Sequence, residues 1–314
     1  MRVNGDSGPA LSVVVAATDH RPTLPRCLLA IDAARGAGDE LIVVDDPALA
    51  GAASARNHGA VAASHAVLVF VDADVEVCLD ALERIRTRFA NDPTLAGLFG
   101  SYDDEPEERD VVSTFRNLLH HHVHTGAGGD SNSFWAGLGA VRRTTFAQLG
   151  GFDTRCTWVE DVEFGARLGA TGRIELDPRI QGKHLKRWTF PDMVMTDLTR
   201  RGIPWTRLAV RGRATHSELN LAWRHRISTA SSVALVVSLA RRQPAAAGGA
   251  LAVLCVINRH LYRLLADRGG RHLLGGIGLH VVHHLTSVVA LVVGVLGMRG
   301  AAGGAPATPA TGDR

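Results

Sequence analysis

The sequence predicts an α/β domain with a mostly parallel sheet flanked by helices, followed by a C-terminal hydrophobic helical region. Short apolar runs alternate with helical stretches over the first half of the 314-residue chain, and strands that are apolar throughout are typical of a sheet covered on both faces. Hydrophobic residues make up 46% of the chain, enough for a buried core. After about residue 188, long uncharged stretches replace the alternation.

The predicted strands are short runs rich in apolar and β-branched residues. They occupy residues 11–16, 40–44, 66–71, 95–100, 134–141 and 173–176. Prolines stand where the first helix begins, and one face of the third is expected to carry Leu79, Leu82, Ile85 and Phe89. The predicted helices occupy residues 24–34, 50–63, 78–90, 111–124, 143–149 and 159–168. Because ligands bind beyond the carboxyl ends of such strands, we expect the site at that edge of the sheet.

The C-terminal part contains three stretches without Asp, Glu, Lys or Arg: Ile227–Ala240, Gln243–Asn258 and His272–Met298. A membrane-spanning helix needs about 20 predominantly apolar residues. The last stretch is long enough, whereas the first two are marginal spans or a hairpin inserted part-way. The alternative is a buried helical domain. The net charge is +7 from Glu218 onward and −4 before it, which indicates an anionic membrane surface rather than nucleic acid as the partner.

The composition shifts divide the chain into four parts. We expect a catalytic domain at 1–188, an amphipathic junction at 189–226, membrane-associated helices at 227–299 and a disordered tail at 300–314. None of the four cysteines lies in a CxxC pair, which argues against a zinc ribbon and fits a reducing compartment. The polar start of the chain lacks the apolar stretch of a signal peptide, so a cytoplasmic catalytic domain is expected at the inner membrane.

Two carboxylates, Asp72 and Asp74, follow the apolar run VLVFV. Acids spaced i, i+2 at a strand end can converge on one ligand, and their oxygens suit Mg²⁺ or Mn²⁺. A solvated turn is the alternative. Asp45 and Asp46 end the second strand, where a carboxylate could accept hydrogen bonds from a base or a ribose, or simply cap a turn.

Two further segments contain residues that could take part in catalysis or binding. Arg56 lies in an Ala-rich helix and could pair with a phosphate, although a lone helical Arg is more often just solvated. Glu160 and Asp161 open a helix, where acids commonly interact with the helix dipole. Asp161 becomes a candidate base if that helix start faces the sugar site.

Together these segments resemble family 2 glycosyltransferases, which have the GT-A fold. The matching pieces are LSVVVAATDHRPTLPRCL, ELIVVDD, GAASARNHGA, VFVDADV, FWAGLGAVRRTTFAQLGGFD and WVEDVEFGARLGATG, spanning roughly residues 11–180. The later segments GKHLKRWTF, TDLTRRGIPWTRL, INRHLYRLL and GLHVVHHLTS are similar to a membrane-associated bacterial branch with hydrophobic C-terminal helices.

The resemblance implies roles for individual residues. Contacts to the nucleotide are implied for Thr18, Asp19, Asp45 or Asp46, and Arg56. The DxD pair is implied to hold the metal, with Asp74 the direct ligand, Asp72 beside it and His184 a further contact to metal or diphosphate. Asp161 matches the catalytic base. The chain departs from the family at Ala16-Ala17-Thr18-Asp19, where Pro-Thr-Tyr-Asn is usual, and at Val75, where a third Asp is frequent.

The predicted reaction is an inverting transfer of a sugar from a UDP- or GDP-linked donor to a lipid or glycan acceptor near the membrane. Two alternatives remain: a nucleotidyltransferase of similar fold, and a noncatalytic membrane protein that binds nucleotide sugars. The absence of a GxGxxG motif after the first strand counts against a nicotinamide dehydrogenase. Of the clustered His120, His121, His122 and His124, only the first and last share a helix face, so a polar face is favoured over a metal site.

Overall fold

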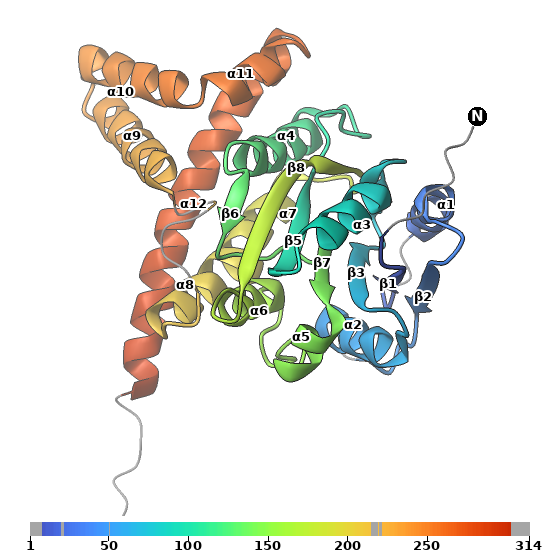
Figure 1. The fold of residues 1–314 in the computed structure, drawn as a ribbon. Coiled ribbons are helices and arrows are strands. Elements are labelled where there is room, and N and C mark those ends of the chain that lie inside the picture. The colour runs from blue at the N-terminus through green and yellow to red at the C-terminus, as the bar shows by residue number, and fades with distance from the viewer. Residues whose placement is uncertain (1–7, 20–21, 50, 215–218, 220–221, 303–314) are drawn as a thin grey trace, which may run out of the picture.

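The computed structural model describes residues 8–19, 22–49, 51–214, 219 and 222–302, apart from the side chains of 299–302. An eight-stranded sheet forms its centre, in the order β2-β1-β3-β7-β5-β8-β4, with β6 paired to β8 (Figure 1). The strands are β1 (Leu11–Ala16), β2 (Glu40–Val44), β3 (Val67–Asp72), β4 (Val75–Val77), β5 (Leu95–Tyr102), β6 (Gly129–Ser131), β7 (Leu138–Arg142) and β8 (Arg173–His184).

The α/β class with a helix-flanked sheet is confirmed, but the sheet is mixed rather than mostly parallel. β1 pairs in parallel with β2 and β3, and β5 with β8. The β3–β7, β5–β7, β4–β8 and β6–β8 pairs are antiparallel. The hydrophobic pattern could not reveal this, because a strand buried on both faces is apolar throughout in either direction.

Helices cover both faces of the sheet, and alternate side chains of each strand enter two different cores. Val13 and Val15 pack with α1 (Leu24–Ala34) and α3 (Ala81–Asn91). Val14 faces the other core. The helices on that side are α2 (Gly51–Ala62), α4 (Val111–Thr125), α5 (Arg143–Gln148) and α6 (Glu160–Gly169). All six predicted helices are present, with ends shifted by at most three residues.

The C-terminal helices extend the second core instead of forming a separate one. Leu254, Leu261 and Leu279 belong to the same cluster of buried residues as Phe115 and Leu118 of α4. The elements are α7 (Phe190–Met195), the π-helix η1 (Thr196–Gly202), α8 (Ile203–Val210), α9 (Trp223–Ala240), α10 (Pro244–Ile257), α11 (Arg259–Ala266) and α12 (Gly270–Ala302).

One helix of the described part, α12, is long and apolar enough by itself to cross a membrane. α10 and α11 pass the same test only as a pair, and they are bent by 85° at the break between them. The predicted disordered tail lies, from residue 303 on, outside the described residues.

Candidate active site

Three parallel strands end side by side and bring most of the predicted donor-binding residues to one edge of the sheet. Ala16 at the end of β1 lies opposite Val44 of β2 and Asp72 of β3. Thr18 and Asp19, which follow β1, and Asp45 and Asp46, which follow β2, therefore flank the DxD segment. Asp19, Asp45 and Asp46 are exposed, and Thr18 is half-buried. Asp46 also caps its own turn by accepting a 2.9 Å hydrogen bond from the Ala48 amide.

Arg56 of α2 joins this edge to the start of α6. Its guanidinium donates to Asp72 Oδ1 and to Glu160 Oε1, each at 2.6 Å. The Arg56 side chain is buried, as is that of Glu160, whereas Asp72 remains one-third exposed. Burying one cation is tolerable here because two carboxylates compensate it. The arginine expected at a phosphate thus holds two acids together in this structure.

Asp161 lies next to this ion-pair cluster. Burial, followed by the neighbouring charge of Glu160, raises the pKa of Asp161 to about 7, against the opposing effect of Arg56. The Val162 amide donates to Asp161 Oδ1 at 2.8 Å. A carboxyl group with a pKa near neutrality can both accept and release a proton under physiological conditions.

Asp74 meets His184 because β4 pairs with the last residues of β8. Val75 lies opposite His184, and the Leu185 amide donates to the Asp74 carbonyl at 2.8 Å. His184 Nε2 is 3.6 Å from Asp74 Oδ2, and both residues are buried. The structure thus brings the two predicted positions together, although the predicted last strand ended at Leu176, eight residues before His184.

The other ring nitrogen of His184 is held by α4. Nδ1 lies 2.7 Å from Asn117 Oδ1, and since an amide oxygen only accepts, Nδ1 carries the proton. The other ring nitrogen, Nε2, faces the Asp74 carboxylate. Tyr102 stacks on the ring with centroids 4.3 Å apart and fixes its plane.

The π-helix η1 contributes a cation that sequence reasoning missed. Arg201 is exposed and, among the described residues, has no hydrogen-bond or ion-pair partner. It lies close enough to Asp161 for its charge to lower the pKa of that acid. The neighbouring Arg200 stacks on the Trp158 ring at 4.5 Å, which ties η1 to the loop before α6. Trp158 adopts a left-handed backbone with φ of 74°, a conformation that is strained for a large side chain.

The histidines of α4 form a packed polar face. His121 and His124 each place Nδ1 2.9 Å from a backbone carbonyl of β5. Burial, with a contribution from Arg201, lowers the pKa values of His120 and His124. Among the described residues, no group of three or more His, Cys, Asp or Glu side chains could hold a metal ion.

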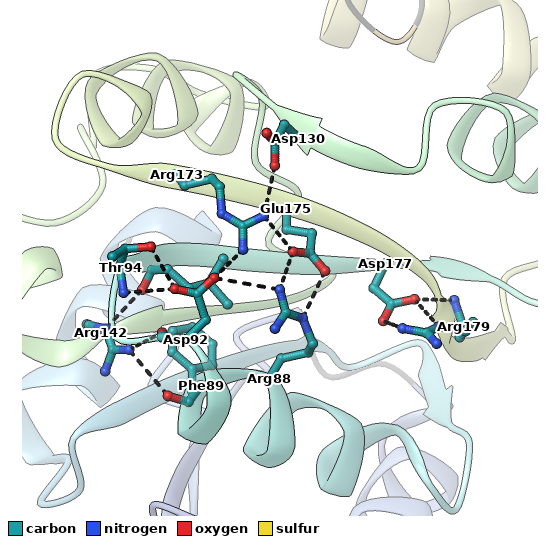
Figure 2. A network of polar contacts seen from close by, with 11 residues as sticks. Arg88, Phe89, Asp92, Thr94, Asp130, Arg142, Arg173, Glu175, Asp177 and Arg179 are labelled. Carbon is teal, nitrogen blue, oxygen red and sulfur yellow. Dashed lines mark hydrogen bonds and ion pairs between the residues drawn. The ribbon is translucent and has the colours of Figure 1, made fainter.

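A second polar network lies at the opposite edge of the sheet, where β5 and β8 begin (Figure 2). Arg88 of α3 donates to Glu175 at 3.0 and 2.5 Å. Arg173 contacts Asp92 and also donates to Asp130 at 2.8 Å. These pairs join α3, β6 and β8, so the network stabilises the fold at the edge of the sheet opposite the site.

Asn117 and Arg201 are the functional candidates that the sequence did not single out. Glu160 was noted there only as the acidic neighbour of Asp161 at a helix start. No local sequence pattern pointed to Asn117, because its partner His184 lies 67 positions further along the chain. Arg201 stood in a segment noted only for its likeness to membrane-associated relatives.

Both the sequence and the fold are similar to those of known proteins. Residues 47–148 match the family model described as Glycosyl transferase family 2. The fold is similar to that of the mannosyltransferase PcManGT from Pyrobaculum calidifontis, solved with GDP-Man and Mn²⁺, at a TM-score of 0.55 and 17% identity over 92% of this chain and 87% of that one. S. aureus TarS, residues 1–349, matches at a TM-score of 0.47 and 10% identity over 92% of both chains. A search of curated proteins finds no sequence match. The match over residues 47–148, together with the similarity in fold, indicates that the chain is a glycosyltransferase.

Proposed function

We propose that the protein transfers a sugar from a nucleoside-diphosphate donor to a membrane-proximal acceptor, with inversion at the anomeric carbon. The observation that carries this proposal is the bridge from Asp72 through Arg56 to Glu160. It holds the DxD segment beside Asp161, so the groups needed at the diphosphate and at the acceptor hydroxyl share one site. Neither a nucleotidyltransferase nor a noncatalytic binding protein has a comparable observation in its favour.

The donor is proposed to lie across the ends of β1, β2 and β3. Thr18 and Asp19 would contact the nucleotide, and Asp45 or Asp46 would accept hydrogen bonds from the base or ribose. Their exposure at neighbouring strand ends supports this placement. The bound GDP-Man in the similar archaeal mannosyltransferase supports a nucleotide-sugar donor, either GDP- or UDP-linked.

Asp74 and His184 fit a divalent cation, Mg²⁺ or Mn²⁺. Their facing O and N atoms are 3.6 Å apart, so a side-chain shift of less than an ångström would bring both to one ion at metal–ligand distances of about 2.0–2.1 Å. The Asn117 hydrogen bond orients the imidazole as outer-shell partners of metal-binding histidines do. When bound, the cation would stabilise charge on the departing diphosphate. Asp72, the first acid of the DxD segment, would contact the same cation with the carboxylate oxygen that does not bind Arg56.

Asp161 is proposed as the base that takes the proton from the acceptor hydroxyl. Its raised pKa suits proton acceptance near neutral pH. Because the hydroxyl attacks the face of the sugar opposite the leaving diphosphate, a single displacement inverts the anomeric configuration.

The acceptor is proposed to be lipid-linked or a glycan held near the membrane. η1 supports this, because Asp197 of η1 binds His283 of α12 at 2.7 Å while Arg200 of the same element stacks on Trp158 in the loop before α6. We retain the division into a catalytic domain at 1–188, a junction at 189–226 and membrane-associated helices at 227–299, with the catalytic domain on the cytoplasmic side of the inner membrane.

Asp161→Asn tests the proposal most directly. The variant should bind donor as the wild type does, measured by calorimetry with Mn²⁺ and a panel of GDP- and UDP-sugars, and its kcat should fall by about 10²–10⁴-fold. Asp130→Asn, at the opposite edge of the sheet, is the matched control and should retain full turnover. Wild-type turnover by Asp161→Asn would refute the assignment of the base.

A further inference from the structure

Helix α12 lies against the catalytic domain over most of its length (Figure 1). Gly275 packs on Val111 at the start of α4, where an added Cβ would meet Val111 Cγ1 at 2.6 Å. Gly294 packs on Thr206 of α8, where the corresponding distance is 2.8 Å. The two glycines are nineteen positions apart, roughly 28 Å along a helix. That length nearly equals the hydrocarbon thickness of a bilayer, about 30 Å.

The elements packed on α12 carry charges that a hydrocarbon layer would not tolerate. Arg201 of η1 and Arg207 of α8 are exposed, and Arg207 reaches Gly297 near the end of α12. Midway along α12, His283 binds Asp197, which pairs with Arg116 at 2.7 Å. If α12 stood across a bilayer, η1 and α8 would be carried to the same depth, and charged side chains there are costly.

Large hydrophobic side chains of α12 are exposed, most of them in its last third. Those between 43% and 74% exposed are Leu274, Val289, Leu291, Val292, Val293 and Leu296. Because the neighbouring η1 and α8 carry exposed charges, these apolar side chains suit contact with a membrane interface better than passage through its hydrocarbon.

The hairpin of α9 and α10 has arms too short to cross a bilayer and a charged tip. Ile227–Ala240, the uncharged arm of α9, has fourteen residues, roughly 21 Å. Arg241 and Arg242 follow it at the exposed turn. Insertion tip-first would leave both arginines inside the hydrocarbon, whereas a hairpin lying flat keeps them among headgroups.

The positive charge of α9–α12 favours an anionic lipid. Between Trp223 and Met298 the chain has eight arginines and a single acidic residue, Asp267. Trp223, at the start of α9, is 69% exposed, as suits a side chain at the headgroup level. An anionic surface complements this arrangement.

We propose that α9–α12 attach the enzyme to one leaflet of an anionic bilayer and that no segment crosses it. This inference rests on the membrane attachment proposed above and adds its depth and topology. Since η1 contacts α12 through Asp197 and the loop before α6 through Arg200, attachment in this orientation sets the active site beside the headgroups.

Labelling from one side of the membrane tests the topology. Single-cysteine variants are made with Cys78, Cys156 and Cys255 replaced by Ser; the fully buried Cys27 stays and reports unfolded protein. Gln243→Cys marks the hairpin turn, Met298→Cys marks the end of α12, and Val61→Cys marks the catalytic domain. In inside-out membrane vesicles, all three should react equally with a membrane-impermeant maleimide. Protection of Gln243→Cys or Met298→Cys, relieved by detergent, would overturn the single-leaflet topology.

Vesicle flotation tests attachment separately. The wild type should float with phosphatidylglycerol vesicles and much less with phosphatidylcholine vesicles. Arg241→Gln with Arg242→Asn, the latter chosen because Asn tolerates the left-handed backbone at residue 242, should lower partitioning onto phosphatidylglycerol roughly tenfold or more. Absence of flotation with either lipid would overturn attachment itself, whereas flotation with a protected cysteine would overturn only the topology. Sugar transfer to a soluble acceptor should be unchanged in the double variant.

Discussion

Asp72 of β3 and Glu160 of α6 bind the same guanidinium, each 2.6 Å from one terminal nitrogen of Arg56. This relationship makes the two halves of the site mutually dependent. β3 carries the DxD, α6 carries Asp161, and the cation between them offsets repulsion between acids that must stay close. This arrangement also leaves Arg56 Nε buried without a hydrogen-bond partner among the described residues. The site therefore contains an unsatisfied hydrogen-bond donor.

Removing that cation should destabilise the protein. Arg56→Ala leaves Glu160 buried and unpaired, and we expect a loss of about 3 kcal/mol in the free energy of unfolding, measured with urea. Arg56→Lys should recover only part of it, because an ammonium cannot span both acids as the guanidinium does. Arg35→Ala, which breaks the exposed pair with Asp32, is the control and should cost less than about 1 kcal/mol. Equal losses from the two Ala variants would contradict the bridging role.

The raised pKa of Asp161 predicts the pH dependence of transfer. A base must be deprotonated to act, so kcat/KM should rise with pH and level off above about 7. Arg201 lowers the pKa of Asp161, and Arg201→Gln should therefore move the rising limb to higher pH. A limb that stays in place in the variant would show that Arg201 does not act on Asp161.

The same shift predicts how stability depends on pH. The folded protein retains the Asp161 proton at pH values where the unfolded chain, with an ordinary carboxyl pKa near 4, has lost it. This contribution to the free energy of unfolding is therefore present at low pH and is lost as pH rises through about 7. Asp161→Asn should be more stable than the wild type at pH 8 and similar at pH 4 in urea titrations. A constant difference between the two proteins would refute the shift.

The contact between Asn117 and His184 predicts a positioning role. Asn117→Ala removes the partner of Nδ1 and should raise the Mn²⁺ concentration for half-maximal transfer about tenfold or more, with little change in kcat at saturating metal. His184→Gln should raise this Mn²⁺ concentration further. Asn132→Ala, on the loop after β6, is the comparison variant and should leave the Mn²⁺ concentration unchanged. Should Asn117→Ala lower kcat at every metal concentration instead, its role would be general rather than tied to the metal.

The network of Figure 2 should matter for stability alone. Arg173→Ala removes contacts to Asp92 and Asp130 from a side chain that is one-third exposed. We expect a loss of about 1 kcal/mol in urea unfolding and a kcat/KM within twofold of wild type. A large loss of transfer in a stably folded variant would place that edge of the sheet in the catalytic cycle.

Much of the local structure was predictable because it depends on short-range patterns. The apolar runs located β1, β2 and β3, and the bounds of α1 were predicted to the residue. The three-residue strands β4 and β6 were missed, since a strand that short has almost no pattern of its own. The missing β4 matters, because its pairing with β8 is what brings His184 to Asp74.

By itself, the sequence determined which residues could do chemistry and where along the chain each strand ends, because polar side chains after buried runs must emerge at the edge of a sheet. Only the tertiary structure decided how those side chains are used. It paired Arg56 with two acids instead of leaving it free, supplied Asn117 and Arg201 from distant helices, and laid α12 along the domain. The physical reason is that strand direction, buried ion pairs and helix packing depend on contacts between distant segments, which local hydrophobic patterns do not encode.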